Sequence, residues 1–206
     1  ENVYVAGSQE LVLGQNLNST LTSFSNLNVT GNSLNNHIYG NDANNRLDGG
    51  AGADTISGAD GADSMVFDAA DVIDGGDGFD TLIFGAGAAT LNLINPYTIN
   101  AIEMIDLRNA GGATVLTISA SDVLDLNAPQ DFTLTPNELW VQRESADTVN
   151  LVDGDGAGGD EGWINNGVVV EKGFLYTDFS ATTASLETVH VYVATGPGSV
   201  FVTLAP

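Results

Sequence analysis

The sequence predicts an all-β fold: a parallel β-solenoid (a β-roll or β-helix) followed by a β-rich C-terminal region. Residues 31–66 repeat with a period of nine, and short strand-like runs separated by Gly, Pro, Asn or Asp continue toward the C-terminus. No segment has the apolar periodicity of a long helix. We expect solenoid coils over residues 1–30, the repeat array over 31–85 and a flanking or capping region over 86–206.

The first thirty residues already resemble solenoid coils. The runs ENVYVAG, ELVLG and SNLNVTG are short, rich in β-forming residues and ended by Gly. Their alternation of apolar and polar residues is that of strands with one buried face.

The repeat array consists of nine-residue blocks. They begin at Gly31, Gly40, Gly49 and Gly58, and a further block begins at Gly75 after the off-register stretch FDAADVID. The last three blocks follow G-G-x-G-x-D-x-U-x, where U is a large apolar residue, with Ala59 in place of one Gly. This nonapeptide is the unit of a parallel β-solenoid that binds Ca²⁺ in its turns. The apolar residues expected to point inward are Ile38, Leu47, Ile56, Met65 and Ile83.

Two nonapeptides make one coil, so loops eighteen residues apart should stack on the same side. The Gly40 loop then faces the Gly58 loop, and the Gly49 loop faces FDAADVID. A disordered, Gly-rich acidic linker is the alternative interpretation, but it does not explain why the apolar position recurs so regularly.

The residue types of the loops suit calcium. Asp54, Asp63 and Asp80 supply carboxylates at the sixth position, and the glycines expose main-chain carbonyls. Oxygen ligands in a flexible loop fit Ca²⁺ better than Mg²⁺ or Zn²⁺. Asn36 and Asn45 occupy the sixth position of the first two blocks and add no charge. We therefore expect weak or empty sites there, where an Asn ladder can form hydrogen bonds without a metal.

Composition supports a cation-binding protein. The 206 residues include 27 Asp and Glu against 4 Lys and Arg, for a formal charge of −23, and self-repulsion on this scale opposes compaction unless cations neutralise it. A content of 43% hydrophobic and 15% charged residues excludes general disorder. The acidic balance argues against nucleic-acid binding, and no apolar run is long enough for a membrane span. Cysteine is absent, so there is no disulfide framework.

Residues 86–206 predict further short strands. Asn166-Gly167 is the best local hairpin signal, and Ser119–Leu126 is the one possible helical turn, with Ser121 or Asp122 as its cap. The acidic loop that holds Asp153, Asp155 and Asp160 is a further candidate calcium site, although a solvated loop is the favoured interpretation.

No arrangement typical of catalysis is found in the sequence. His37 and His190 lie far apart, and neither belongs to a metal or triad motif. A set of aromatic residues can be a carbohydrate-binding strip, but we favour core or cap positions for them: Trp140, Trp163, Tyr176 and Tyr192. We expect a chain that is not an enzyme. Since it starts at Glu1 without an initiating Met or a visible signal peptide, we expect a fragment or a processed form.

The blocks GGAGADTIS, GADGADSMV and GGDGFDTLI resemble the RTX (repeats-in-toxin) family of calcium-binding secreted bacterial proteins. The flanks, including AIEMIDL and ELWVQRESADTVNLV, look like the C-terminal region of large RTX adhesins and surface proteins, so that the resemblance covers roughly Asn26 to Val152. It implies one-step type I secretion and folding triggered by external Ca²⁺.

The resemblance also implies the calcium ligands, which are the sixth side chain and the carbonyls of the first four residues of each block. The Gly49 loop lacks a regular partner, so Asp68 or Asp71 is expected to substitute. We expect no metal at Gln142–Ser145. The residues expected to line the metal sites are Asn45, Gly49, Gly50, Ala51, Gly52, Asp54, Gly58, Ala59, Asp60, Gly61, Asp63, Asp71, Gly75, Gly76, Asp77, Gly78 and Asp80.

The sequence therefore predicts a calcium-dependent extracellular structural or adhesive module of a bacterial surface or matrix protein. Its expected partners are calcium ions, a cell-surface or extracellular ligand, or further copies of itself stacked through unpaired strand edges. The alternative is the C-terminal secretion and folding domain of an RTX enzyme (a protease, lipase or epimerase) whose catalytic part is absent.

Overall fold

The structure is a computed structural model, and the chain divides into two compact units that we describe separately. The first unit comprises the described residues up to Gly85 together with 99–102, and the second unit comprises the remaining described residues. The structure describes residues 2–5, 10–12, 18–21, 26, 28–85, 90–92, 99–108, 112–126, 137–144, 146–152, 162–171, 174–183, 187–195 and 202–204. The candidate loop with Asp153, Asp155 and Asp160 lies outside these residues.

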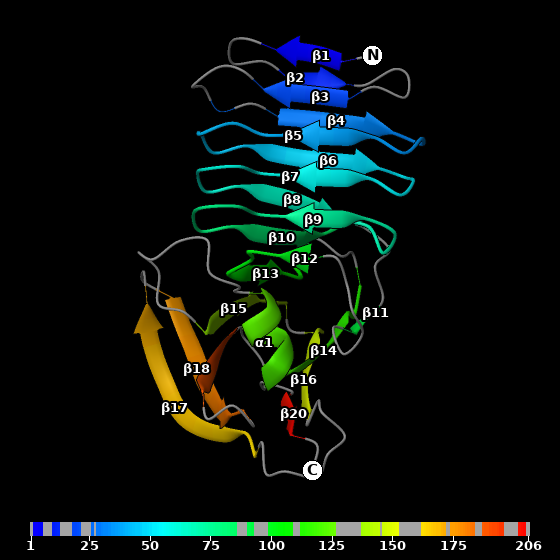
Figure 1. Ribbon diagram of the computed structural model, residues 1–206. Coiled ribbons are helices and arrows are strands. Elements are labelled where there is room, and N and C mark those ends of the chain that lie inside the picture. Colours follow the sequence, from blue (N-terminus) through cyan, green and yellow to red (C-terminus); the bar gives the residue numbers. More distant parts are fainter. Residues whose placement is uncertain are drawn as a thin grey trace. The chain divides into compact units, whose positions relative to one another are not determined.

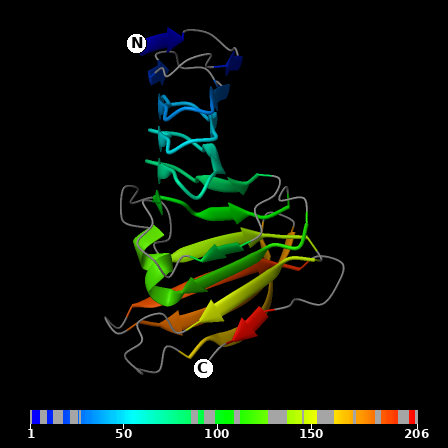
Figure 2. The same cartoon turned by 90° about the vertical axis from the view of Figure 1, so that its right-hand side faces the viewer.

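The first unit has two walls of parallel strands, stacked rung upon rung (Figure 1). In the turned view of Figure 2 the walls stand on either side of a narrow interior. One wall contains β1 (Asn2–Val5), β3 (Asn18–Leu21), β5 (His37–Tyr39), β7 (Thr55–Ser57), β9 (Val72–Asp74) and β12 (Ile99–Asn100). The other contains β2 (Glu10–Val12), β4 (Asn28–Asn32), β6 (Arg46–Gly50), β8 (Ser64–Phe67) and β10 (Thr81–Phe84).

The register of these strands places like residues over like. Ile38 pairs with Ile56 in one wall and Leu47 with Met65 in the other, and all four side chains are at most 1% exposed. The predicted parallel solenoid and its inward apolar line are therefore confirmed. The expectation for Ile83 was wrong: Leu82 pairs with Met65 and is fully buried, whereas Ile83 belongs to the opposite face of β10. Counted from Gly75, Leu82 is the eighth residue of its block.

The second and fourth residues of the Gly-rich loops have a left-handed backbone. Gly50 and Gly76, at the second position, have φ of 87° and 97°. Ala59 occupies the same place in its block and adopts φ of 78°, a conformation that costs a residue with a Cβ about 1–2 kcal/mol. The stacked loops therefore impose the backbone that glycine prefers even where the sequence has alanine.

Replacing Ala59 by glycine is expected to stabilise the first unit. Glycine removes the left-handed penalty at φ 78°, and the greater entropy of the unfolded chain offsets part of this gain. We expect a net gain of about 0.5–1 kcal/mol in calcium, measured by urea unfolding. Ala62→Gly, at an exposed position of the same loop with no positive φ, is the matched control and should not stabilise. Equal effects of the two substitutions would contradict the strain argument.

The described residues of the second unit form two sheets and one short helix. The first sheet has the order β17 (Ile164–Glu171), β18 (Phe174–Thr182), β19 (Thr188–Ala194), β15 (Glu138–Gln142) and β13 (Met104–Asp106). The second has the order β11 (Thr90–Asn92), β14 (Val115–Ser119), β16 (Thr148–Val152) and β20 (Val202–Leu204). Alternate residues of β15 and β19 form the buried face of their sheet, because Leu139, Val141, Val189 and Val191 are all fully buried.

The predicted helical turn is present as α1 (Ala120–Leu126), which contacts β14 and β19. Its cap is Ser119 and not Ser121 or Asp122. The Ser119 Oγ accepts the N–H of Asp122 at 3.2 Å, and the Asp122 Oδ2 accepts the N–H of Ser119 at 2.7 Å, so the two residues form a reciprocal capping box. With seven residues, this helix of the described chain is too short to cross a membrane.

The hairpin prediction at Asn166-Gly167 was wrong in position. Both residues lie inside β17, where the register shifts between Asn165 and Gly167 and Gly167 has φ of 99°. Glu171 pairs with Phe174, and β17 and β18 are antiparallel. An Asn-Gly pair suits a β-bulge as well as a tight turn because both need a left-handed residue.

Candidate metal centre

Each sixth-position carboxylate of the array joins its own loop to the loop one coil earlier. The Oδ1 of Asp63 accepts the buried N–H of Asn45 at 2.7 Å, and the N–H of Asp63 is donated to the Oδ1 of Asp80 at 2.7 Å. The carbonyl of Asn45 in turn accepts the N–H of Ser64 at 2.9 Å. We call Asn45, Asp63 and Asp80 the Asp63 column; it confirms that the Gly40, Gly58 and Gly75 loops stack.

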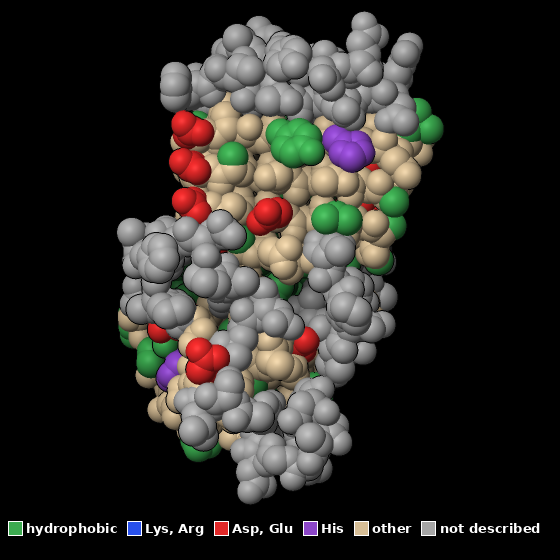
Figure 3. Space-filling view, viewed as in Figure 1, with side chains coloured by type: hydrophobic (Ala, Val, Ile, Leu, Met, Phe, Trp, Pro, Cys, Tyr) green, Lys and Arg blue, Asp and Glu red, His purple; other side chains and the backbone are tan. Residues whose placement is uncertain are grey.

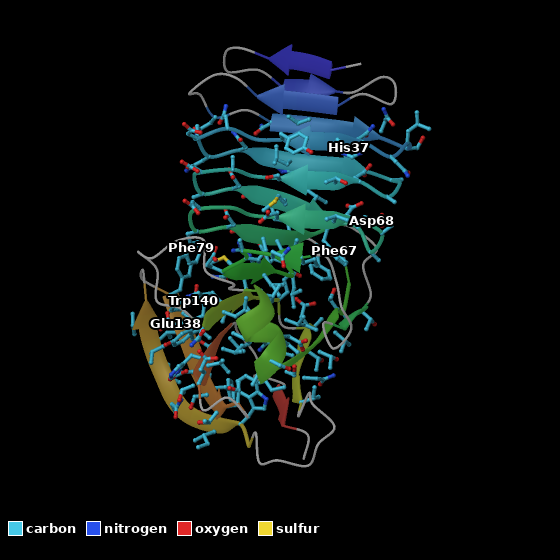
Figure 4. The ribbon with its side chains drawn as sticks, in the orientation of Figure 1. His37, Phe67, Asp68, Phe79, Glu138 and Trp140 are labelled. Carbon is cyan, nitrogen blue, oxygen red and sulfur yellow. The ribbon has the colours of Figure 1, made fainter. Side chains whose placement is uncertain are left out.

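A second column stands at the opposite edge of the array. The Oδ1 of Asp54 accepts the N–H of Asn36 at 2.7 Å, and the N–H of Asp54 is donated to the Oδ1 of Asp71 at 2.9 Å. Asn36, Asp54 and Asp71 are the Asp54 column. Figure 4 labels Phe79 in the Gly75 loop and Asp68 in the off-register loop, and the two lie at opposite edges of the array.

Asp71, and not Asp68, is the structural equivalent of the sixth-position aspartate in the off-register segment. Asp54 and Asp71 are 17 residues apart, whereas Asn36 and Asp54 are 18 apart, so this coil closes with one residue fewer. Asp71 is 4% exposed. The Oδ1 of Asp68 instead accepts the N–H of Ala70 at 3.2 Å in an exposed turn. The stacked loop therefore keeps its buried carboxylate although its sequence has lost the repeat.

The second oxygen of the buried carboxylates is the unusual feature of the site. The Oδ2 atoms of Asp54 and Asp63 are buried and have no hydrogen-bond partner among the described residues, although each side chain is only 1% exposed. An unsatisfied buried polar atom costs about 1–3 kcal/mol, and more when it is charged. These two oxygens therefore favour a cation.

The first glycine of each block leaves space for this oxygen. A Cβ on Gly58 would overlap both the Oδ2 of Asp63 and the carbonyl oxygen of Gly75 in the next loop. A Cβ on Gly75 would likewise overlap the Oδ2 of Asp80, at 2.6 Å, and the carbonyl oxygen of Ala101. A carboxylate oxygen and a main-chain carbonyl oxygen from the next coil thus approach the same place, where only glycine fits.

The two Asn loops are closed by hydrogen bonds within the loop. The Oδ1 of Asn45 accepts the N–H of Asn41 at 2.9 Å, and its Nδ2 donates to the Oδ1 of Asn41 at 3.1 Å. The Oδ1 of Asn36 accepts the N–H of Asn32 at 3.0 Å in the same way. These loops hold their shape through amide hydrogen bonds within each loop; Asn36 and Asn45 belong to different columns, so they do not form the expected ladder with each other.

Burial raises the pKa of the stacked carboxyl groups in the absence of metal. Desolvation raises the pKa of Asp63 and of Asp80 to about 7 and that of Asp71 to about 6, with neighbouring carboxylates as a further cause. The pKa of Asp54 is also raised, chiefly by burial. The hydrogen bond that each Oδ1 accepts from the previous coil opposes these shifts and does not cancel them.

Main-chain oxygens have to complete any metal site in these loops. No three acidic or histidine side chains converge in the part of the chain that the structure describes. Each loop offers one buried carboxylate and several carbonyls instead, which is an all-oxygen donor set. Calcium takes six to eight such ligands in flexible geometry, so the loops fit this ion better than they fit magnesium or zinc.

Comparison with known families agrees with this chemistry. The family model of the RTX calcium-binding nonapeptide repeat (4 copies) matches residues 30–65 and 68–91. The array is made of RTX repeats. These repeats bind calcium, and they occur in secreted bacterial proteins. Among curated proteins, none matches the chain.

The RTX array also carries acidic residues on its surface. The third positions of the blocks in the Asp63 column are Asp42, Asp60 and Asp77, all exposed, and Asp60 pairs with Asp77 in a parallel bridge. Figure 3 shows acidic side chains one above another along one edge of the array. Because stacked rungs are about 4.8 Å apart, these like charges repel one another when no cations are nearby.

The other residues considered from the sequence are not members of the Asp63 column or of the Asp54 column. His190 Nδ1 lies 2.9 Å from Asp178 Oδ1 on the second unit, and His37 is exposed on β5. Trp140 stacks on Tyr192 with ring centroids 4.1 Å apart and meets Tyr176 edge-on. Trp163 is separate, and its Nε1 donates to the carbonyl of Val152 at 3.3 Å. Figure 4 labels Trp140 and Glu138, which are two residues apart on β15.

Proposed function

We propose that this chain is a calcium-dependent structural or adhesive module of a type I-secreted bacterial surface or matrix protein, without catalytic activity of its own. The single observation that supports it best is the pair of buried, unpartnered carboxylate oxygens, Oδ2 of Asp54 and of Asp63, beside glycine positions that admit no side chain. Such an arrangement is unfavourable in the metal-free chain and favourable once a cation is bound.

The proposed side-chain ligands are the carboxylates of the two columns: Asp54, Asp63, Asp71 and Asp80. The proposed main-chain ligands are carbonyls of the loops that start at Gly49, Gly58 and Gly75. We leave Asn45 out of the strongest sites, because both polar atoms of its side chain are already bonded to Asn41. When bound, calcium would neutralise the buried charge and hold consecutive coils together, and this would couple its binding to folding.

The proposed role is structural because the array presents a repeated, rigid surface and no reactive constellation. Its buried side chains are apolar core residues, the amides of Asn36, Asn41 and Asn45, and the loop carboxylates that hydrogen-bond to the neighbouring coil. A secreted protein built this way would stay extended until it reaches the calcium outside the cell and would fold there. Adhesion would then depend on a solenoid that calcium stabilises.

Calorimetric titration of the chelator-treated chain with Ca²⁺, with circular dichroism on the same samples, tests the proposal. We expect strand signal to be low in chelator and to be restored at about 10⁻⁴ to 10⁻³ M Ca²⁺, the usual range for extracellular modules. Calcium at a hundred times its dissociation constant should stabilise by about 2.7 kcal/mol per site. Magnesium at the same concentration is the control and should restore little. Equal melting temperatures with and without Ca²⁺ would rule the proposal out.

A further inference from the structure

The second unit contains a buried aspartate that repeats the hydrogen bonds of the RTX columns. The Oδ1 of Asp147 accepts the N–H of Thr114 at 3.0 Å, and the carbonyl of Thr114 accepts the N–H of Thr148 at 2.8 Å. In the array, Asp54 and Thr55 make the same two bonds to Asn36: the Oδ1 of Asp54 accepts the N–H of Asn36 at 2.7 Å, and the carbonyl of Asn36 accepts the N–H of Thr55 at 2.9 Å. Asp147 is 1% exposed, as Asp54 is. The triplet Ala-Asp-Thr occurs at both places, over 53–55 and 146–148.

The second oxygen of Asp147 differs from those of the array. Its Oδ2 accepts the N–H of Glu144 at 2.7 Å, so it has a partner within its own loop. The loop also lacks the glycines of the repeat, because residues 142–147 read Gln-Arg-Glu-Ser-Ala-Asp. The aspartate and its bond to the previous coil are retained, whereas the glycines are not.

A cation of the chain itself lies in this loop. Arg143 is 4% exposed and is the buried basic residue among those that the structure describes, since Arg46 and Arg108 are exposed. Its Nη1 donates to the carbonyl oxygens of Glu144, at 3.0 Å, and of Asp147, at 2.9 Å. The guanidinium thus binds main-chain carbonyls of the loop beside a buried carboxylate, which is the combination of ligands that the array offers to a metal ion.

We infer that Arg143 replaces the calcium ion in a loop derived from the same architecture, so that the second unit keeps its fold without calcium. Burial lowers the pKa of Arg143 and the charge of Asp147 opposes part of this shift; an arginine pKa lies so far above neutral pH that the side chain keeps its positive charge. The chain has only four basic residues and a formal charge of −23, yet it buries one of these four here. A buried cation is tolerated only where it is compensated, as it is by Asp147 and the two carbonyls.

The consequence is a chain with one calcium-dependent unit and one calcium-independent unit. The second unit would then be folded before calcium is met, and the array would fold afterwards. The inference that Arg143 replaces a metal ion does not require calcium to bind the array. The role of Arg143 is tested in chelator, where the array contributes nothing to the signal that is measured.

Tryptophan fluorescence isolates the second unit, because both tryptophans of the chain, Trp140 and Trp163, belong to it. The test is urea unfolding of the full chain, with and without Ca²⁺, followed by this signal. For the wild type we expect the same midpoint in chelator and in Ca²⁺, while strand signal from the array depends on Ca²⁺. A fluorescence midpoint that collapses in chelator would overturn the inference. If the strand signal of the array does not depend on Ca²⁺, the proposed function is wrong, but the inference about the second unit is unaffected.

Substitutions at Arg143 decide whether its charge matters. In chelator, Arg143→Met should raise the unfolding constant of the second unit at least about tenfold, since it leaves two carbonyls and a buried carboxylate without the cation. Arg143→Lys keeps the charge and should lose less. Arg46→Met removes an exposed arginine whose Nη1 lies 3.8 Å from Asp48 Oδ2 and is the control for the loss of one positive charge, with little effect expected. If the Met variant does not fold, a folded Lys variant supports the role of the charge. A Lys variant no better than Met, or a Met variant like the Arg46 control, overturns it.

Discussion

Asp63→Ala is expected to raise the Ca²⁺ concentration needed for refolding by at least about tenfold. The substitution removes a buried Oδ2 proposed as a ligand and the Oδ1 that accepts the N–H of Asn45 at 2.7 Å. Asp63 is the middle member of its column, and the variant keeps the main-chain N–H that is donated to the Oδ1 of Asp80. The expected loss therefore comes from the side chain, which is proposed as a metal ligand and which bonds the Gly58 loop to the Gly40 loop.

Two control variants separate this effect from simpler ones. Asn36→Ala removes the acceptor for the N–H of Asn32, an uncharged bond worth about 1 kcal/mol. Asp60→Ala removes the same charge as Asp63→Ala from the same loop, but from an exposed position. The refolding midpoint in Ca²⁺, followed by circular dichroism, should move far less in both controls. If Asn36→Ala shifts this midpoint as far as Asp63→Ala does, the assignment of ligands along the columns is wrong.

The array was predictable from the sequence because its period is tied directly to its structure. Two nine-residue blocks make one coil, so the residues that stack are those 18 apart, and Asn36 and Asp54 are found bonded as this requires. The choice between Asp68 and Asp71 stayed open because the off-register segment is one residue short. The folded structure selects Asp71, because its Oδ1 accepts the N–H of Asp54 at 2.9 Å.

The second unit was less predictable because its local patterns allow more than one structure. Asn166-Gly167 suits a turn and a bulge equally, and the pairing of β17 with β18 selects the bulge. Asp147 was missed because the glycines around it are replaced, including one by Arg143. The signal that remained was Ala-Asp-Thr followed by an apolar residue. This is too short a motif to stand out without the stacking that brings Thr114 next to it.

The response of the array to pH is expected to reverse when calcium is added. In chelator, the folded pKa of Asp63 and Asp80 is about 7 and that of Asp71 about 6, whereas an unfolded Asp has a pKa of about 3.9. The folded state therefore binds more protons than the unfolded state between these values. The stability that these three protonated groups contribute is fully present below about pH 4 and is lost as the pH rises through 6 to 7. Without calcium, the array should be more stable at pH 5 than at pH 7.5.

Calcium requires the same carboxylates in their deprotonated form, so its affinity should fall at least about tenfold between pH 7.5 and 5.5. In saturating Ca²⁺ the melting temperature should accordingly rise with pH over the range in which it falls in chelator. Melting curves at both pH values, with and without Ca²⁺, measure the reversal. Asp42 and Asp60 are exposed, so 0.5 M NaCl screens the repulsion between such surface charges and leaves the buried groups largely unscreened. If the reversal disappears in that salt, the surface charges cause it and the buried columns do not.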